Sequence, residues 1–132
     1  MKSVLHTGIG AAVGLAVALV LVIAVELFSS VVHPIPANLA GNIPEHVRRY
    51  PQWVLAVVVP MWGATALAAA WVAARLGNRT AGLVVTVLLV CALLFNLSML
   101  PYVMWFKIVM PVALVAACII GVRHGTRAAP AS

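Results

Sequence analysis

The sequence predicts an all-α integral membrane protein, a four-helix bundle whose transmembrane helices run up-down-up-down through the bilayer. The 132 residues are 65% hydrophobic and only 8% charged, which leaves too little polar surface for a soluble domain of this size. Four apolar segments are long enough to cross a bilayer, which takes about 20 residues. Basic residues stand singly or in pairs between these segments, as they do beside the spans of membrane proteins.

The predicted spans form a single domain over residues 1–132 and cover residues 8–32, 52–74, 81–97 and 102–122. The first apolar segment is longer than the roughly 7–15 residues of a signal-peptide core, so we expect it to be a retained span. Turn-forming residues separate the spans. They are His33-Pro-Ile-Pro36, Tyr50-Pro51, Leu76-Gly-Asn-Arg79 and Leu100-Pro101.

The basic residues predict the orientation. With the N-terminus in the cytoplasm, the cytoplasmic side holds Lys2, Arg75, Arg79, Arg123 and Arg127. The other side then holds Arg48 and Arg49. Because cytoplasmic loops carry the excess of Lys and Arg, we expect both termini to be cytoplasmic and the protein to lie in the cell (inner) membrane.

The loop of residues 33–51 is then external, and it can form a short interfacial helix. Asn42 is a suitable N-cap, Pro44 fits a first turn, and Glu45 favours the positive end of the helix dipole. Such a helix would place its apolar side on the membrane surface. That side comprises Ile43, Val47 and Tyr50. An irregular Pro-rich loop is the alternative.

Ionisable residues inside a span are costly, so they mark candidate sites. The first span carries a polar stripe at helical spacing, formed by Glu26, Ser29, Ser30 and His33. Glu26 and Lys107 both lie roughly 8–10 Å from the outer ends of their helices, and Asn96 lies near the same level. We therefore predict a polar cluster in which Glu26 faces Lys107. The alternatives are a Lys107 that snorkels to the interface, serines that bond to the preceding turn, and an interfacial His33.

Small residues and prolines predict the shape around this cluster. Small residues recur every four positions along the inner halves of the first two spans, at Gly10, Gly14 and Ala18 and at Ala66, Ala70 and Ala74. We expect these two rows to pack against each other. Pro60 and Pro111 lie in the outer halves, where a proline kink lets helices splay. The predicted bundle is closed on the cytoplasmic side and open outside, with a floor near Glu26.

Three classes of function fit these features. The first is a structural or accessory subunit, with a membrane protein partner or a homodimer, whose polar cluster fixes helix packing. The second is a small proton-coupled transporter that uses Glu26, and the third is a membrane enzyme or lipid-binding protein with Glu26 and His33 as an acid–base pair. The residues indicate no metal, cofactor or assigned catalytic group, and the scattered charge of +6 predicts a lipid partner and no nucleic acid.

Overall fold

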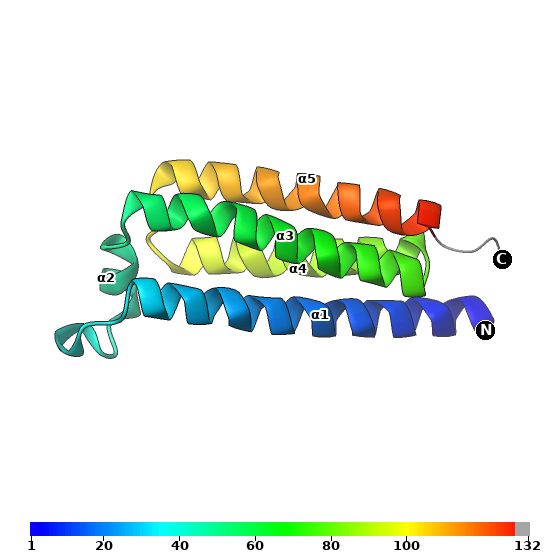
Figure 1. Ribbon diagram of the computed structural model, residues 1–132, viewed down its shortest axis with the longest axis horizontal. Helices are drawn as coiled ribbons and strands as arrows, with labels where there is room; N and C mark the ends of the chain where they lie inside the picture. The colour runs from blue at the N-terminus through cyan, green and yellow to red at the C-terminus, as the bar shows by residue number, and fades with distance from the viewer. Residues whose placement is uncertain (129–132) are drawn as a thin grey trace.

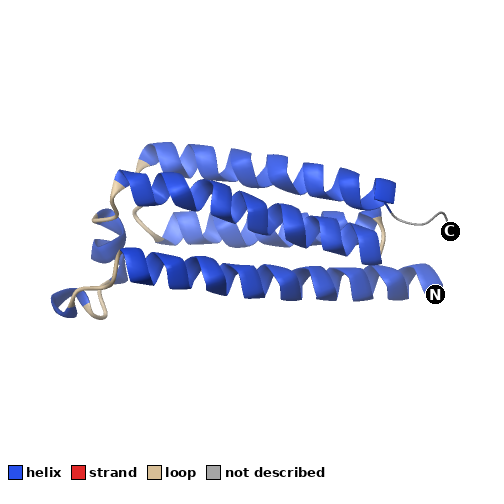
Figure 2. Ribbon diagram, in the orientation of Figure 1, coloured by secondary structure: helices blue, strands red, loops and turns tan. Residues whose placement is uncertain are grey.

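The computed structural model describes residues 1–128, and within that range the chain contains helices and connecting loops but no strand (Figure 2). Four helices are long and apolar enough to span a membrane. They are α1 (Lys2–Val32), α3 (Gln52–Leu76), α4 (Arg79–Met99) and α5 (Met104–Ala128). They lie alongside one another and alternate in direction (Figure 1). The predicted all-α, four-helix fold is thereby confirmed.

The helices extend beyond most of the predicted spans, because the helical conformation continues past the apolar residues. Only the last helix starts later than predicted, since α5 begins at Met104 and leaves Tyr102 and Val103 in the preceding turn. The backbone N–H of Tyr102 donates to the carbonyl of Leu100 (3.0 Å) around Pro101. This tight turn places the ring of Tyr102 at the end of the bundle rather than within a helix.

Helix α3 is the centre of the bundle and contacts all three other long helices. Helix α4 also contacts both α1 and α5. In contrast, no Cα atoms of α1 and α5 lie within 8 Å of each other. Helices α1 and α5 are therefore diagonal in the bundle, separated by α3 and α4.

Glycines let α1 and α3 approach closely in the half of the bundle that is remote from α2, here called the far half. A Cβ atom added to Gly14 would lie 2.7 Å from the Cβ of Ala73 and 2.8 Å from the carbonyl oxygen of Ala69. One added to Gly10 would lie 2.6 Å from the carbonyl oxygen of Ala73. Ala18 continues this contact and is buried against the same alanines.

The row of small residues on α3 that meets α1 is not the predicted one. Ala69 and Ala73 pack on α1, whereas the row formed by Ala66, Ala70 and Ala74 is buried with α5. Gly121 and Gly125 of α5 lie against this second row, with no room for a side chain. The prediction failed because a central helix needs small residues on two faces, and each row taken alone fits either neighbour.

The loop between α1 and α3 contains a 3-10 helix, η1 (Ala37–Leu39), and the short helix α2 (Ile43–Arg48). The side chain of Asn42 caps α2 by accepting the N–H of Glu45 (3.4 Å), so the helical alternative for this loop is the one observed. Helix α2 lies at one end of the bundle (Figure 1). His46 and Val47 are buried. On the predicted apolar side of α2, Val47 therefore faces the protein, whereas Ile43 is exposed.

A side-chain hydrogen bond joins two segments at the end of the bundle opposite α2. Asn78 caps α4 by accepting the N–H of Ala81 (2.9 Å), and its amide donates to the hydroxyl of Thr7 (2.7 Å). This side chain therefore joins the start of α1 to the turn between α3 and α4.

Candidate functional site

A cavity of about 460 Å³ lies between the four long helices in the half of the bundle nearest α2, here called the α2 half. Its volume falls in the range of small-molecule pockets, roughly 300–1,000 Å³. The walls from α3 and α5 are mainly buried apolar side chains, including Leu55, Val58, Phe106, Met110 and Leu114. The cavity is thus a mostly apolar chamber that all four spans build together.

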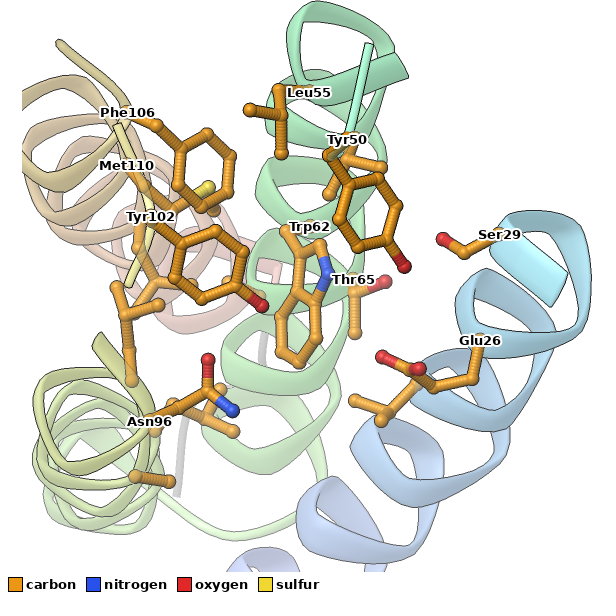
Figure 3. A pocket seen from close by; sticks show the side chains of 17 residues that line it. Glu26, Ser29, Tyr50, Leu55, Trp62, Thr65, Asn96, Tyr102, Phe106 and Met110 are labelled. Carbon is orange, nitrogen blue, oxygen red and sulfur yellow. The ribbon is translucent and has the colours of Figure 1, made fainter. Parts of the chain in front are cut away.

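Polar side chains are gathered at the end of this cavity nearest α2. Glu26 and Ser29 reach it from α1, and Asn96 reaches it from α4 on the other side (Figure 3). The hydroxyl groups of Tyr50 and Tyr102 point into the space between them (Figure 3). A molecule in the cavity would therefore meet hydrogen-bonding groups at one end and hydrocarbon at the other.

The cavity extends deeper than the predicted floor at Glu26. Glu26 lies six residues from the end of α1, which is roughly 9 Å along the helix. Thr65, which lines the cavity from α3, lies 13 residues from the start of its helix, or roughly 20 Å. Thr65 donates its hydroxyl proton to the carbonyl of Met61 (3.0 Å). The deep end is therefore essentially apolar, because this hydroxyl is already bonded.

Five of the six residues of the predicted cluster lie around connected spaces. A second, smaller cavity of about 200 Å³ lies under α2 and shares part of its lining with the first. Glu26, Ser29 and Asn96 line both cavities, whereas Ser30 and His33 line the smaller one alone. The hydroxyl of Ser30 donates to the carbonyl of Leu27 (2.9 Å), the local bonding that was the alternative for the serines.

The predicted ion pair between Glu26 and Lys107 is wrong. Within residues 1–128, the side-chain ion pairs are those of Glu45 with Arg48 and Arg49. Lys107 lies on α5, the helix diagonal to α1, and it lines neither cavity. The two residues lie at similar depths, but depth alone does not specify which helices are neighbours.

The patterns in the sequence did not indicate the aromatic side chains of the site. Tyr50, Tyr102 and Trp62 line the large cavity (Figure 3). Tyr50 and Tyr102 each adjoin a proline at the beginning of a span, so the chain holds both rings at the same end of the bundle. This shared position was the available signal, but aromatic residues near span ends are also typical of the membrane interface.

Burial and nearby negative charge raise the pKa of both tyrosines. Burial raises the pKa of Tyr102 to about 12, and charge on Tyr50 and Glu26 acts in the same direction. Burial also raises the pKa of Tyr50, again with a contribution from Glu26. Both phenols therefore remain protonated at neutral pH and are able to donate a hydrogen bond to a molecule in the cavity.

Three rings close the smaller cavity beneath α2. The rings of His33 and His46 are stacked with their centroids 4.6 Å apart and nearly parallel, and Tyr50 packs against both. Burial lowers the pKa of His46, and the neighbouring His33 lowers it further. The lone pairs of an imidazole lie in the ring plane, so two stacked rings do not direct their nitrogens at one metal ion.

No protein family, curated protein or solved structure matches the chain.

Proposed function

We propose that this multi-pass membrane protein binds an amphipathic molecule in the cavity of the α2 half. The observation that carries the proposal is the cavity itself, about 460 Å³ with an apolar deep end and polar groups near α2. A well-formed apolar pocket with a few convergent polar groups is the usual form of a small-molecule site. The molecule would place its apolar part among the side chains of α3 and α5 and its polar head near Glu26 and Asn96.

This proposal develops the lipid-binding alternative rather than the accessory subunit. The accessory hypothesis used the polar cluster to fix helix packing, whereas in the described part of the chain Glu26 forms no ion pair across the bundle and instead lines a cavity. An acid–base enzyme has less support, because Glu26 and His33 lie two turns apart on α1, roughly 10 Å, which is too far for direct proton transfer between them.

A transporter would also need a route through the far half. The close approach of α1 and α3 at Gly10 and Gly14 leaves no room there for a side chain. The contact of Gly121 and Gly125 with α3 is similarly tight. In a single copy of the chain, the α1–α3 and α3–α5 interfaces of the far half therefore leave no room for a transported molecule at these positions.

Native mass spectrometry of the protein released from its own membranes tests the proposal. The wild-type chain should carry a small molecule or lipid in stoichiometric amount. Ala92 lines the cavity, so Ala92→Trp should fill part of it and remove the bound mass. Leu94 lies on the same helix but is 51% exposed and lines neither cavity. Leu94→Trp is therefore the matched control, and this variant should retain the bound mass. A wild-type chain that carries only a partner protein would contradict the proposal and favour the accessory subunit.

A further inference from the structure

We infer that the ligand of the large cavity carries an ammonium group, which the Glu26 carboxylate holds beside the aromatic rings, and that it enters sideways from the bilayer between α1 and α4. This inference rests on the proposed function and specifies the chemical class of the ligand. It follows from the charges at the polar end, the rings around them and the side of the bundle on which the cavity opens.

The charges at the polar end are unbalanced. Glu26 is the one acidic residue that lines either cavity, and no lysine or arginine of residues 1–128 lines them. The partners that a carboxylate prefers, Lys and Arg, are therefore missing from its surroundings. Glu26 is exposed on a helix that is long and apolar enough to span a membrane, and a charge at that depth is costly without a compensating partner. A ligand with a positive head supplies that partner, whereas an anionic head would be repelled.

The aromatic rings around Glu26 also favour a ligand with a positively charged head. Tyr50, Tyr102 and Trp62 surround the space that the carboxylate faces (Figure 3). The ring of Phe106 packs against Tyr102, with centroids 4.9 Å apart, and completes the wall. The faces of aromatic rings attract cations, and rings arranged around a quaternary ammonium group are a common mode of recognition. A carboxylate among aromatic rings thus favours an ammonium over a neutral alcohol of the same shape.

The cavity opens toward the bilayer between α1 and α4. The lining residues that are exposed are Glu26 on α1 and Ala92 and Asn96 on α4, whereas the lining residues of α3 and α5 are buried or partly buried. Helices α1 and α4 pack together in the far half, where Ala18 is buried with Val85. A molecule dissolved in the membrane therefore reaches the polar groups directly, with its apolar part already at the depth of the chamber.

Fluorescence quenching tests the inference. The chain has four tryptophans, so the substitutions Trp53→Phe, Trp71→Phe and Trp105→Phe leave Trp62 in the cavity as the sole reporter. The probes are dodecyl chains with a terminal bromine, one with a trimethylammonium head and one with a hydroxyl head. Both are titrated into nanodiscs of uncharged glycolipid that contain the Trp62-only protein. A Trp53-only chain is the control, because Trp53 is 57% exposed and lines neither cavity.

We expect saturable quenching of Trp62 by both probes, with a lower midpoint for the ammonium probe, and only unsaturable quenching of Trp53. Glu26→Gln should raise the ammonium midpoint about tenfold or more and change the hydroxyl midpoint less than twofold. Tyr102→Leu should also reduce the preference for ammonium. Circular dichroism of each variant checks that it is folded.

The outcomes separate the inference from the proposed function. Equal midpoints for the two probes, with equal effects of Glu26→Gln, would overturn the ammonium inference but leave cavity binding intact. A Trp62 that no probe quenches saturably would refute the proposed function itself.

The ammonium group can belong to a lipid head group or to a free amphipathic amine. Adding phosphatidylethanolamine to the nanodiscs distinguishes these sources. A lipid ligand raises the midpoint of the ammonium probe by competition in the wild-type protein and not in Glu26→Gln, whereas an unchanged midpoint indicates a free amine.

Discussion

The contact between α1 and α3 predicts a large effect of one methyl group at Gly14. In Gly14→Ala, the new Cβ atom would lie 2.7 Å from the Cβ of Ala73 and 2.8 Å from the carbonyl oxygen of Ala69. Non-bonded carbon atoms prefer roughly 3.5–4.0 Å. Helix α1 must therefore move away from α3 by about 1 Å, which weakens the packing of Ala18 along the same contact.

Overpacking of this kind typically costs about 1–3 kcal/mol. The better helix propensity of alanine offsets up to about 1 kcal/mol. We expect the free energy of unfolding of Gly14→Ala to fall by about 1–2 kcal/mol, measured by circular dichroism during titration with SDS in mixed micelles. Gly8→Ala is the matched control on the same helix, because an added Cβ there meets nothing within 4 Å.

A second substitution tests whether the contact with Ala73 causes the loss of stability in Gly14→Ala. Ala73→Gly removes the nearest of the three atoms that the new Cβ in Gly14→Ala would meet, so the double variant should recover part of the lost stability. At Gly10 the nearest atoms all belong to the backbone, including the carbonyl oxygen of Ala73, so Ala73→Gly should not rescue Gly10→Ala. If Gly14→Ala is as stable as Gly8→Ala, the close approach of α1 and α3 is wrong.

Four further predictions concern single side chains. Glu26→Gln and Lys107→Met should change the free energy of unfolding additively to within about 0.5 kcal/mol, and a larger coupling in the double-mutant cycle would show that they interact. Asn78→Ala should cost about 1–2 kcal/mol through loss of the cap of α4, and Asn78→Asp should cost less because it keeps an acceptor. Since burial lowers the pKa of His46 below 6.5, the unfolded chain binds the proton more readily. Unfolding measured across pH should therefore show stability falling as the pH drops below 6.5 and levelling off once the folded form is protonated, a dependence that His46→Leu should reduce. In an absorbance titration, a phenol should ionise near pH 12, and Tyr102→Phe should remove that phase.

The sequence predicted the helices well and their neighbours poorly. Apolar length fixes a span, because the bilayer thickness demands about 20 residues, and four helices followed from four such segments. The position of a residue along a helix also follows from the sequence, and Glu26 and Asn96 line the same cavities. Which helices touch was not predictable in this way. The diagonal arrangement of α1 and α5 separates Lys107 from Glu26, and no local pattern in either segment specifies that arrangement.

The polar part of the site was easier to predict than the apolar part. A carboxylate in a span is conspicuous because its burial is costly. Tyr50 and Trp62 are not conspicuous, because aromatic residues are common at the membrane interface and within apolar segments. The cavity is moreover a volume between helices rather than a property of one segment. It depends on crossing positions and side-chain sizes in four helices together, which a single sequence does not specify.

Residue size explains why the cavity lies in one half of the bundle. In the far half, Gly10, Gly14 and Gly121 bring backbones together, and van der Waals contacts hold the helices without space between them. In the α2 half, large rings such as Trp62 and Phe106 line the cavity between the helices. An apolar chain bound in the cavity would make packing contacts with side chains of all four helices and stabilise α1 against its neighbours, so ligand binding and bundle stability should rise together.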